Sequence, residues 1–319
     1  MKKNLNQELQ DAFAALDAER VKALLAAGAD KSRRIRNRLL LQSCGKTKPT
    51  EPVKPEPWKD HPVTEYQQKR YMKQLQKYPE EVKAYNDHIQ YMTLLLENGA
   101  NPNAKDPNGD WCEYGTALCS SLVDGYNLEE AELLVKYGAK PAQDDAIWIA
   151  EHRIDCEGLP LIKFLYDHGA NINAKDYMGD TALMKVAGFE AISAPDLFSE
   201  STKWLTEPIE YFVSRGANLN LRDNSGKTAL VRSLAQNWHD YYGWGNEIAL
   251  KYKGNFSATF YYEIPKILLS NGAQVGIKDN SGKDALAHAA ADEEKMDLFA
   301  RAIDDSNKFL RQKIVVMSR

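Results

Sequence analysis

Hydrophobic residues recur along this chain at helical spacing, in short segments that each end at a Gly-Ala pair. An apolar stripe from Leu9 to Leu25 predicts two helices, over 7–15 and 18–27. Glycine directly after a helix adopts the left-handed conformation that closes its C-terminus. The chain is therefore predicted to be built from helices of similar length with similar ends. The glycines of the Gly-Ala pairs are Gly28, Gly99, Gly138, Gly169, Gly216 and Gly272.

A second pattern, Asp-x-x-Gly followed by Thr-Ala-Leu, alternates with these helical segments. Asp can bond its own backbone and Gly accepts a positive φ, so Asp-x-x-Gly predicts a tight turn. The threonine that follows is a favourable N-cap, which predicts the start of a helix. The turns begin at Asp106, Asp176, Asp223 and Asp279, and the caps are Thr116, Thr181, Thr228 and the variant Asp284.

Together these features resemble the ankyrin repeat, a unit of about 33 residues with a β-turn, two helices and a Thr-Pro-Leu-His-x-Ala signature. The resemblance rests on six copies in register. It implies an all-α fold, an ankyrin-repeat solenoid of about seven helix–turn–helix repeats, each packed only on its neighbours. Ala replaces the signature Pro, and the signature His is Cys119, Met184, Val231 or Ala287. We therefore expect the hydrogen bonds of that His to be absent and the array to be less regular and less stable.

Three of the repeats carry insertions, each between the first and the second helix. Loop closure entropy grows only logarithmically with length, so insertions at such loops cost little stability. Residues 1–319 are interpreted as a single solenoid. Its parts are an N-terminal capping repeat 7–30, a repeat 31–105 with insertion 45–79, repeats 106–140 and 141–175, a repeat 176–222 with insertion 188–207, a repeat 223–278 with insertion 236–263, and a C-terminal repeat and capping helix 279–319.

The first insertion is rich in proline and lysine. Its prolines predict an extended, mobile segment over 46–62, followed by an extra helix over 64–78 and a new helix that begins at Pro79. Residues 31–85 contain fourteen basic and six acidic residues, a net charge of about +8. Such a charge run indicates a solvated arm. The alternatives are a surface that steers an acidic partner and, third, a nucleic-acid contact.

Nine aromatic residues fall within the third insertion. Trp and Tyr are enriched in interface hot spots, so this insertion is a candidate protein-binding segment. The alternative is a small core shared with Leu197, Phe198 and Trp204 of the second insertion. The tips of two turns are further candidates. The candidate protein-binding residues are Trp238, Tyr241, Tyr242, Trp244, Asp176, Tyr177, Asp223 and Asn224.

Catalytic and metal-binding patterns receive little support from the sequence. His152 and Cys156 are four residues apart, but Cys112 and Cys119 do not form the close pair that zinc sites use. The chain has neither a glycine-rich phosphate loop nor a Gly-x-Ser-x-Gly motif. We therefore expect no metal, no cofactor and no enzymatic activity. The four cysteines fit reduced, mostly buried thiols.

The bulk composition is that of an ordinary soluble protein, with 43% hydrophobic residues and a net charge of −4. No apolar run approaches the ~20 residues of a membrane span, and no signal-peptide core follows the basic start. These features favour a cytoplasmic protein that is a monomer when free and contacts neither nucleic acid nor membrane.

The resemblance implies a non-catalytic module that binds one protein partner, an inference from fold to function. As the specific hypothesis, the chain is an immunity protein of the bacterial toxin-neutralising type, with a toxin as its partner. The alternatives are a host-directed effector, a scaffold for a cytoplasmic enzyme and, from a different class, an enzyme.

Overall fold

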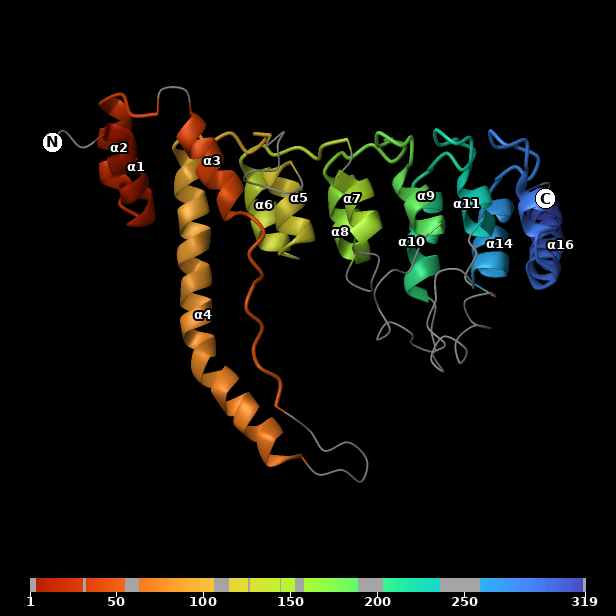
Figure 1. Cartoon of the computed structure of the whole chain (residues 1–319), viewed down its shortest axis with the longest axis horizontal. Coiled ribbons are helices and arrows are strands. Elements are labelled where there is room, and N and C mark those ends of the chain that lie inside the picture. The colour runs from red at the N-terminus through yellow and green to blue at the C-terminus, as the bar shows by residue number, and fades with distance from the viewer. Residues whose placement is uncertain are drawn as a thin grey trace. The chain divides into compact units, whose positions relative to one another are not determined.

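A computed structural model gives the arrangement of the chain (Figure 1). The regular elements of the described residues are helices, and one isolated β-bridge joins Lys105 to Thr116. The chain divides into two compact units, Met1–Lys140 and Pro141–Arg319. The structure describes residues 4–30, 33–54, 63–105, 115–125, 127–143, 145–152, 158–188, 203–235 and 259–317.

Helices in the first unit pack as pairs, α1 on α2, α3 on α4 and α5 on α6. Asn4, Asp17, Thr64, Thr116 and Asn127 accept a backbone N–H at the start of their helices, as N-caps do. Phe13, Met92 and Leu95 are fully buried in the core of the unit. The helices are α1 (Leu5–Ala14), α2 (Ala18–Ala26), α3 (Arg34–Ser43), α4 (Glu65–Glu97), α5 (Ala117–Val123) and α6 (Leu128–Lys136).

Helix α4 is continuous through Pro79, so the prediction that a new helix begins there is wrong. A proline in a helix interior removes one hydrogen bond and bends the helix, but the turns on both sides keep their own bonds. The ribbon of α4 curves accordingly along its length (Figure 1). The start at Thr64, in contrast, is a capping box with Gln67 and agrees with the predicted helix over 64–78.

The segment 44–54 is extended, as its prolines predicted, but its beginning is not free. Asn127 Nδ2 donates to the Lys46 carbonyl at 2.8 Å, and the Gly45 amide donates to Glu130 Oε2 at 3.1 Å. Lys48 Nζ lies 2.7 Å from Glu129 Oε2. The first residues of this segment are therefore fixed to the start of α6, which corrects the expectation that all of 46–62 is mobile. Residues 55–62 lie outside the described residues.

The second unit stacks its helices in two rows. The first helices of the repeats are α7, α9, α11 and α15, and they contact one another in that order. The second helices follow α8 in the chain and form the other row, in which α10 contacts α14 and α14 contacts α16. Leu183 and Leu230 occupy the same repeat position and are both buried. The elements are α7 (Asp145–His152), α8 (Gly158–Asp167), α9 (Ala182–Ala187), α10 (Lys203–Ser214), α11 (Ala229–Ala235), the π-helix η2 (Thr259–Glu263), α14 (Ile264–Ser270), α15 (Ala285–Ala289) and α16 (Glu293–Met317).

Helix α16 runs unbroken from the second helix of the last repeat into the predicted capping helix. No glycine or proline separates the two stretches, so nothing in the sequence ends the first one. The repeat boundaries and the limits of the insertions proposed from the sequence remain predictions.

All six glycines of the Gly-Ala pairs have a left-handed φ, between 78° and 99°. Each therefore closes a helix as the repeat pattern predicted. Helix pairs that end in this way, joined by Asp-x-x-Gly turns and Thr-capped helices, make the fold an all-α stack of ankyrin type.

Candidate functional site

Three Asp-x-x-Gly turns of the second unit share one hydrogen-bond pattern. In each turn the glycine amide donates to the aspartate carbonyl at 3.0 Å. In each, the aspartate carboxylate also accepts the backbone amides two and four residues later, at 2.8–3.0 Å. The aspartate thus folds its own turn, as expected for this residue. The three turns are 176–179, 223–226 and 279–282.

Asparagine side chains join each of these turns to the next. Asn224 donates its backbone amide to the Met178 carbonyl and Nδ2 to the Tyr177 carbonyl, both at 3.0 Å. Asn280 repeats this arrangement with Ser225 and Asn224, at 2.9 Å for both bonds. The turns therefore form one continuous hydrogen-bonded edge, the turn edge, which residues 176–179, 223–226 and 279–282 define.

The sequence-predicted residues of the turn edge have different environments. Tyr177 is 86% exposed at the tip of its turn. Asn224 is exposed as well, but its amide is used to join two turns. Asp176 is half-buried and Asp223 is buried, and both carboxylates organise their own turns. Of these four residues, Tyr177 therefore has the side chain most available to a partner.

Met178 is a feature of the turn edge that the sequence analysis missed. It is 49% exposed and directly follows Tyr177. The sequence does distinguish this turn. It carries Tyr-Met between Asp and Gly, whereas the other two turns of the edge carry Asn-Ser. Two large apolar side chains at one rigid tip are the most apolar part of the turn edge.

Basic residues on the helices that follow bind the carboxylates of the turns. Arg232 on α11 contacts both Asp223, at 2.8 Å from Nε, and Asp180 of the preceding repeat. On α15, His288 Nε2 lies 2.8 Å from Asp279 Oδ2. Each base lies nine positions after the aspartate of its own turn.

Lys185 on α9 continues this pattern in the preceding repeat. Its Nζ lies 3.5 Å from Asp176, 3.2 Å from Asp180 and 3.2 Å from Glu151. The expected loss of the signature His bonds is offset by bonds from another position. The residue directly after the missing signature His supplies them instead, because its longer or ring-bearing side chain reaches back to the turn.

The environments of these carboxylates set their pKa values in opposite directions. Burial alone would raise the pKa of Asp223, but hydrogen bonds from Ser225, Lys227 and Arg232 outweigh it and lower the pKa. At Asp180 burial is again the largest cause, and it outweighs Arg232 and Lys185, so the pKa is raised. Arg232 therefore contacts two carboxylates of different pKa: that of Asp223 is lowered and that of Asp180 is raised.

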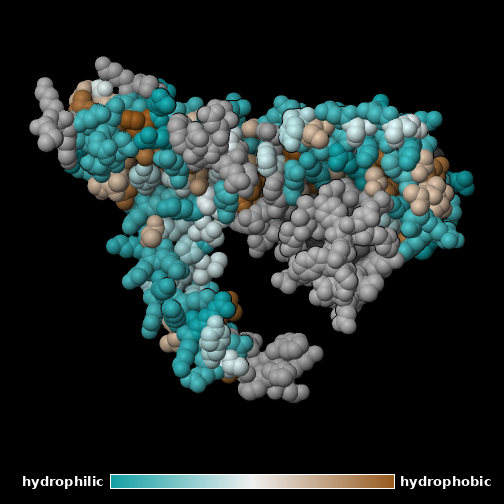
Figure 2. Space-filling view, in the orientation of Figure 1, coloured by the Kyte–Doolittle hydropathy of each residue, from teal (hydrophilic) through white to brown (hydrophobic). Residues whose placement is uncertain are grey.

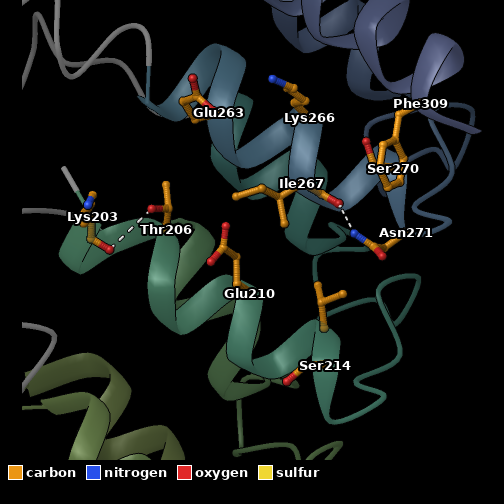
Figure 3. Close-up of a pocket in the computed structure, with 11 residues that line it drawn as sticks. Lys203, Thr206, Glu210, Ser214, Glu263, Lys266, Ile267, Ser270, Asn271 and Phe309 are labelled. Atoms are coloured by element: carbon orange, nitrogen blue, oxygen red, sulfur yellow. Dashed lines mark hydrogen bonds between the residues drawn. The ribbon is translucent and has the colours of Figure 1, made fainter.

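Residues of the second-row helices α10, α14 and α16 line a hollow of about 710 Å³ (Figure 3). Glu210 of α10 and Ile267 of α14 face each other across it, and Phe309 of α16 lies at one end. Phe309 is 47% exposed, and Lys266 is already engaged with the Tyr262 hydroxyl at 3.2 Å. Among the described residues, no group of three or more His, Cys, Asp or Glu is placed to hold a metal ion.

Several residues singled out from the sequence lie outside the described part of the chain. They are Trp238, Tyr241, Tyr242 and Trp244 of the third insertion, together with Cys112, Cys156, Leu197 and Phe198. The two proposals for the aromatic insertion, a binding segment or a small core, therefore stay open.

No protein-family model matches the sequence, and no curated protein matches it. An ankyrin repeat domain from Acinetobacter baumannii is 21% identical with a TM-score of 0.46, covering 71% of this chain and 98% of its own. The ankyrin repeat protein EF0377 is 16% identical, with a TM-score of 0.34 and coverage of 92% and 97%. The ankyrin repeat domain of Bcl-3, of the IkappaB protein family, is 15% identical, with a TM-score of 0.48 and the same coverage.

No helix in the described ranges is both long enough and apolar enough to cross a membrane. The fold itself rests on the repeated geometry of the chain. Helix pairs closed by left-handed glycines and joined by self-bonded aspartate turns give it an all-α ankyrin-repeat fold.

Proposed function

We propose that this chain is a non-catalytic protein-binding module whose turn edge contacts a protein partner. The observation that carries the proposal is the pair Tyr177 and Met178, 86% and 49% exposed, at the tip of a turn fixed by hydrogen bonds. Aromatic residues and methionine are enriched in protein interfaces. Because the backbone beneath them is already ordered, binding costs little conformational entropy.

The surroundings of this pair suit the rim of a protein interface. Asn224, Ser225, Asn280 and Ser281 are exposed along the same edge and carry polar groups. An apolar centre with a neutral polar rim is the usual composition of a specific interface. The charged groups beneath the edge are already paired with one another, so they support the turns rather than recruit ligands.

As the finer proposal, the partner is a bacterial toxin that the chain neutralises as an immunity protein. A host-directed effector and a scaffold for a cytoplasmic enzyme are the alternatives within the same class. The fold favours these binding roles only by association. Identification of the captured partner distinguishes them, because a toxin, a host protein and a bacterial enzyme are different proteins.

The test is capture of the partner from lysate of the source organism by the full chain and by the double variant Tyr177→Ala/Met178→Ala. Truncation of an interface anchor costs about 2 kcal/mol or more, so we expect at least a tenfold loss of affinity. The matched control is Leu286→Ala, which removes an apolar side chain that is 39% exposed on α15. Unchanged capture by a folded double variant would contradict the proposal and leave the hollow or the third insertion as the candidate surface.

A further inference from the structure

Basic residues flank every turn of the turn edge. Each turn has a base directly before its aspartate, and the second and third turns have another directly after their glycine. We call these five residues the edge bases. The exposed edge bases are Arg222, Lys278 and Lys283, and the half-buried ones are Lys175 and Lys227.

The carboxylates of the same turns lie deeper than the bases. Within 175–180, 222–227 and 278–283, which the structure describes in full, no carboxylate is exposed. The buried ones are Asp180, Asp223 and Asp279, and the half-buried one is Asp176. Glu151 of α7 is exposed nearby, but its carboxylate is already paired with Lys185 at 3.2 Å. The exposed charges of the turn edge are therefore positive.

Two of the edge bases are held in place by neutral oxygens. Lys175 Nζ donates to the Arg222 carbonyl at 2.8 Å, so it reaches the next turn. Arg222 Nε donates to the Gly226 carbonyl at 3.1 Å, and its guanidinium also donates to Asn280 Oδ1 of the third turn at 3.3 Å. In the described part of the chain, no carboxylate forms an ion pair within 4 Å of any edge base. Their charges are thus available to carboxylates of a partner.

The apolar and the basic parts of the turn edge lie at different turns. Tyr177 and Met178 occupy the tip of the first turn, whereas the second and third turns carry Asn-Ser tips and four of the five edge bases. Figure 2 shows the upper rim of the second unit, where these turns lie in Figure 1, as mostly hydrophilic. The edge therefore has one apolar end and a basic remainder.

We propose that the partner of the turn edge presents an acidic protein surface beside an apolar pocket. The pocket receives Tyr177 and Met178, and carboxylates next to it pair with Arg222, Lys278 and Lys283. Opposite charges across an interface favour encounter and suppress wrong partners. This inference rests on the proposed function, to which it adds the chemistry of the partner and its orientation along the edge.

The edge favours a protein over nucleic acid. Proteins that bind single strands stack successive bases on several aromatic rings, whereas Tyr177 is the one aromatic residue of these three turns. The net charge of −4 for the whole chain also opposes a long polyanion. A protein surface, in contrast, offers a few carboxylates at fixed positions around an apolar centre.

The test selects a phage-displayed library of random 12-residue peptides on the full chain. Such a peptide spans up to about 40 Å. Packed helices are about 10 Å apart, so the peptide can reach from the first turn to the third. Peptides that also bind Tyr177→Ala/Met178→Ala are discarded. In the rest we expect aspartate and glutamate to be enriched at least about twofold over the starting library, with lysine and arginine depleted.

A synthetic copy of the most enriched peptide then tests the edge bases by fluorescence anisotropy. Lys278→Glu/Lys283→Glu should weaken its binding at least about tenfold, and added salt should weaken binding to the original chain. The matched control is Lys308→Glu/Arg311→Glu, which reverses two exposed bases of α16 and should leave binding unchanged. Circular dichroism verifies the fold. If the glutamate variant unfolds, Lys278→Gln/Lys283→Gln decides the result, and undiminished binding by the folded variant would overturn the inference.

The outcomes separate this inference from the proposed function. If no selected peptide depends on Tyr177 and Met178, both are contradicted. If dependent peptides are found but carry no excess of acidic residues, only the acidic partner is rejected and the turn edge remains a binding surface. A 20-nucleotide single-stranded DNA that displaces the peptide, and that Lys278→Glu/Lys283→Glu no longer binds, would overturn the inference in favour of nucleic acid.

Discussion

Neighbouring repeats are joined by two kinds of contact, one at an exposed edge and one in the core. In the second unit, Asn224 and Asn280 make equivalent turn-to-turn bonds along an exposed edge. In the first unit, α4 and α6 meet through a buried pair, His88 Nε2 and Glu130 Oε1, 2.6 Å apart and at most 2% exposed in their side chains. The edge joint recurs with the turn motif, whereas the buried joint occurs at one place among the residues that the structure describes.

The buried joint is also a larger network. Glu130 Oε2 accepts the Gly45 amide, and Tyr85 donates its hydroxyl to Asn127 Oδ1 at 2.9 Å. Burial raises the pKa of Tyr85 to about 12, so the phenol stays a donor at physiological pH. A fully satisfied polar network of this kind fixes one arrangement of its elements, here α4, α6 and the extended segment.

The largest expected effect comes from removal of the buried carboxylate. Glu130→Ala leaves His88 and the Gly45 amide without their partner, so we expect a loss of about 3–5 kcal/mol in the free energy of unfolding. Urea unfolding followed by circular dichroism measures it. Glu132→Ala, on an exposed position of the same helix, is the control and should change stability little. A loss below about 1 kcal/mol for Glu130→Ala would mean that the pair does not hold this joint.

The next effect isolates the contact between turns in the second unit. Gly226 and Gly282 have almost the same φ, +82° and +81°, but a Cβ would meet Asn280 at 2.5 Å only at Gly226. Gly282→Ala should therefore cost only the left-handed strain, about 1–2 kcal/mol. Gly226→Ala should cost about 1–3 kcal/mol more because of the clash. Equal losses in thermal or urea unfolding would show that the turns are not tightly stacked.

These two joints also show what the sequence could predict. The repeats, the glycine closures and the burial of Leu183 follow from local periodicity, because each repeat builds the same local structure. The bases at Lys185, Arg232 and His288 could have been found as well, since each follows its turn aspartate by nine positions. Glu130 and His88 are 42 positions apart, and no spacing rule joins them. Their contact depends on how α4 and α6 pack.

Candidate binding residues were harder to predict than the fold. Asp176 and Asp223 match the turn motif, but the motif does not say whether a carboxylate faces a partner or its own backbone. Exposure at Tyr177 depends on the absence of a covering element, which a local pattern cannot report. The part of α4 before Pro79 was predicted as an extra helix, but its continuity through Pro79 depends on helical turns on both sides.

A smaller effect is expected from acid at the turns of the second unit. Burial would raise the pKa of Asp279, but bonds from Ser281, His288 and Lys283 outweigh it and lower the pKa. The folded state therefore binds fewer protons than the unfolded chain near pH 4, and the stability that this carboxylate contributes is lost as pH falls further. Asp279→Asn should cost about 1 kcal/mol at neutral pH and flatten the acid side of the stability curve. An unchanged acid slope in urea titrations would contradict this.

The smallest expected effect is at the exposed tip. Tyr177→Ala should change the free energy of unfolding by less than about 0.5 kcal/mol, because its side chain is 86% exposed. Differential scanning calorimetry beside the Gly226→Ala variant measures the contrast. A clear destabilisation would indicate that Tyr177 packs on the protein and is not available to a partner.

Pro79 divides α4 into two stretches that should exchange their amide hydrogens with solvent at different rates. The stretch before Pro79 has about the length at which an isolated helix is only marginally stable in water, ~12–15 residues. It should open locally at a low free-energy cost, whereas the stretch from Tyr85 onward opens only when its packed neighbours do.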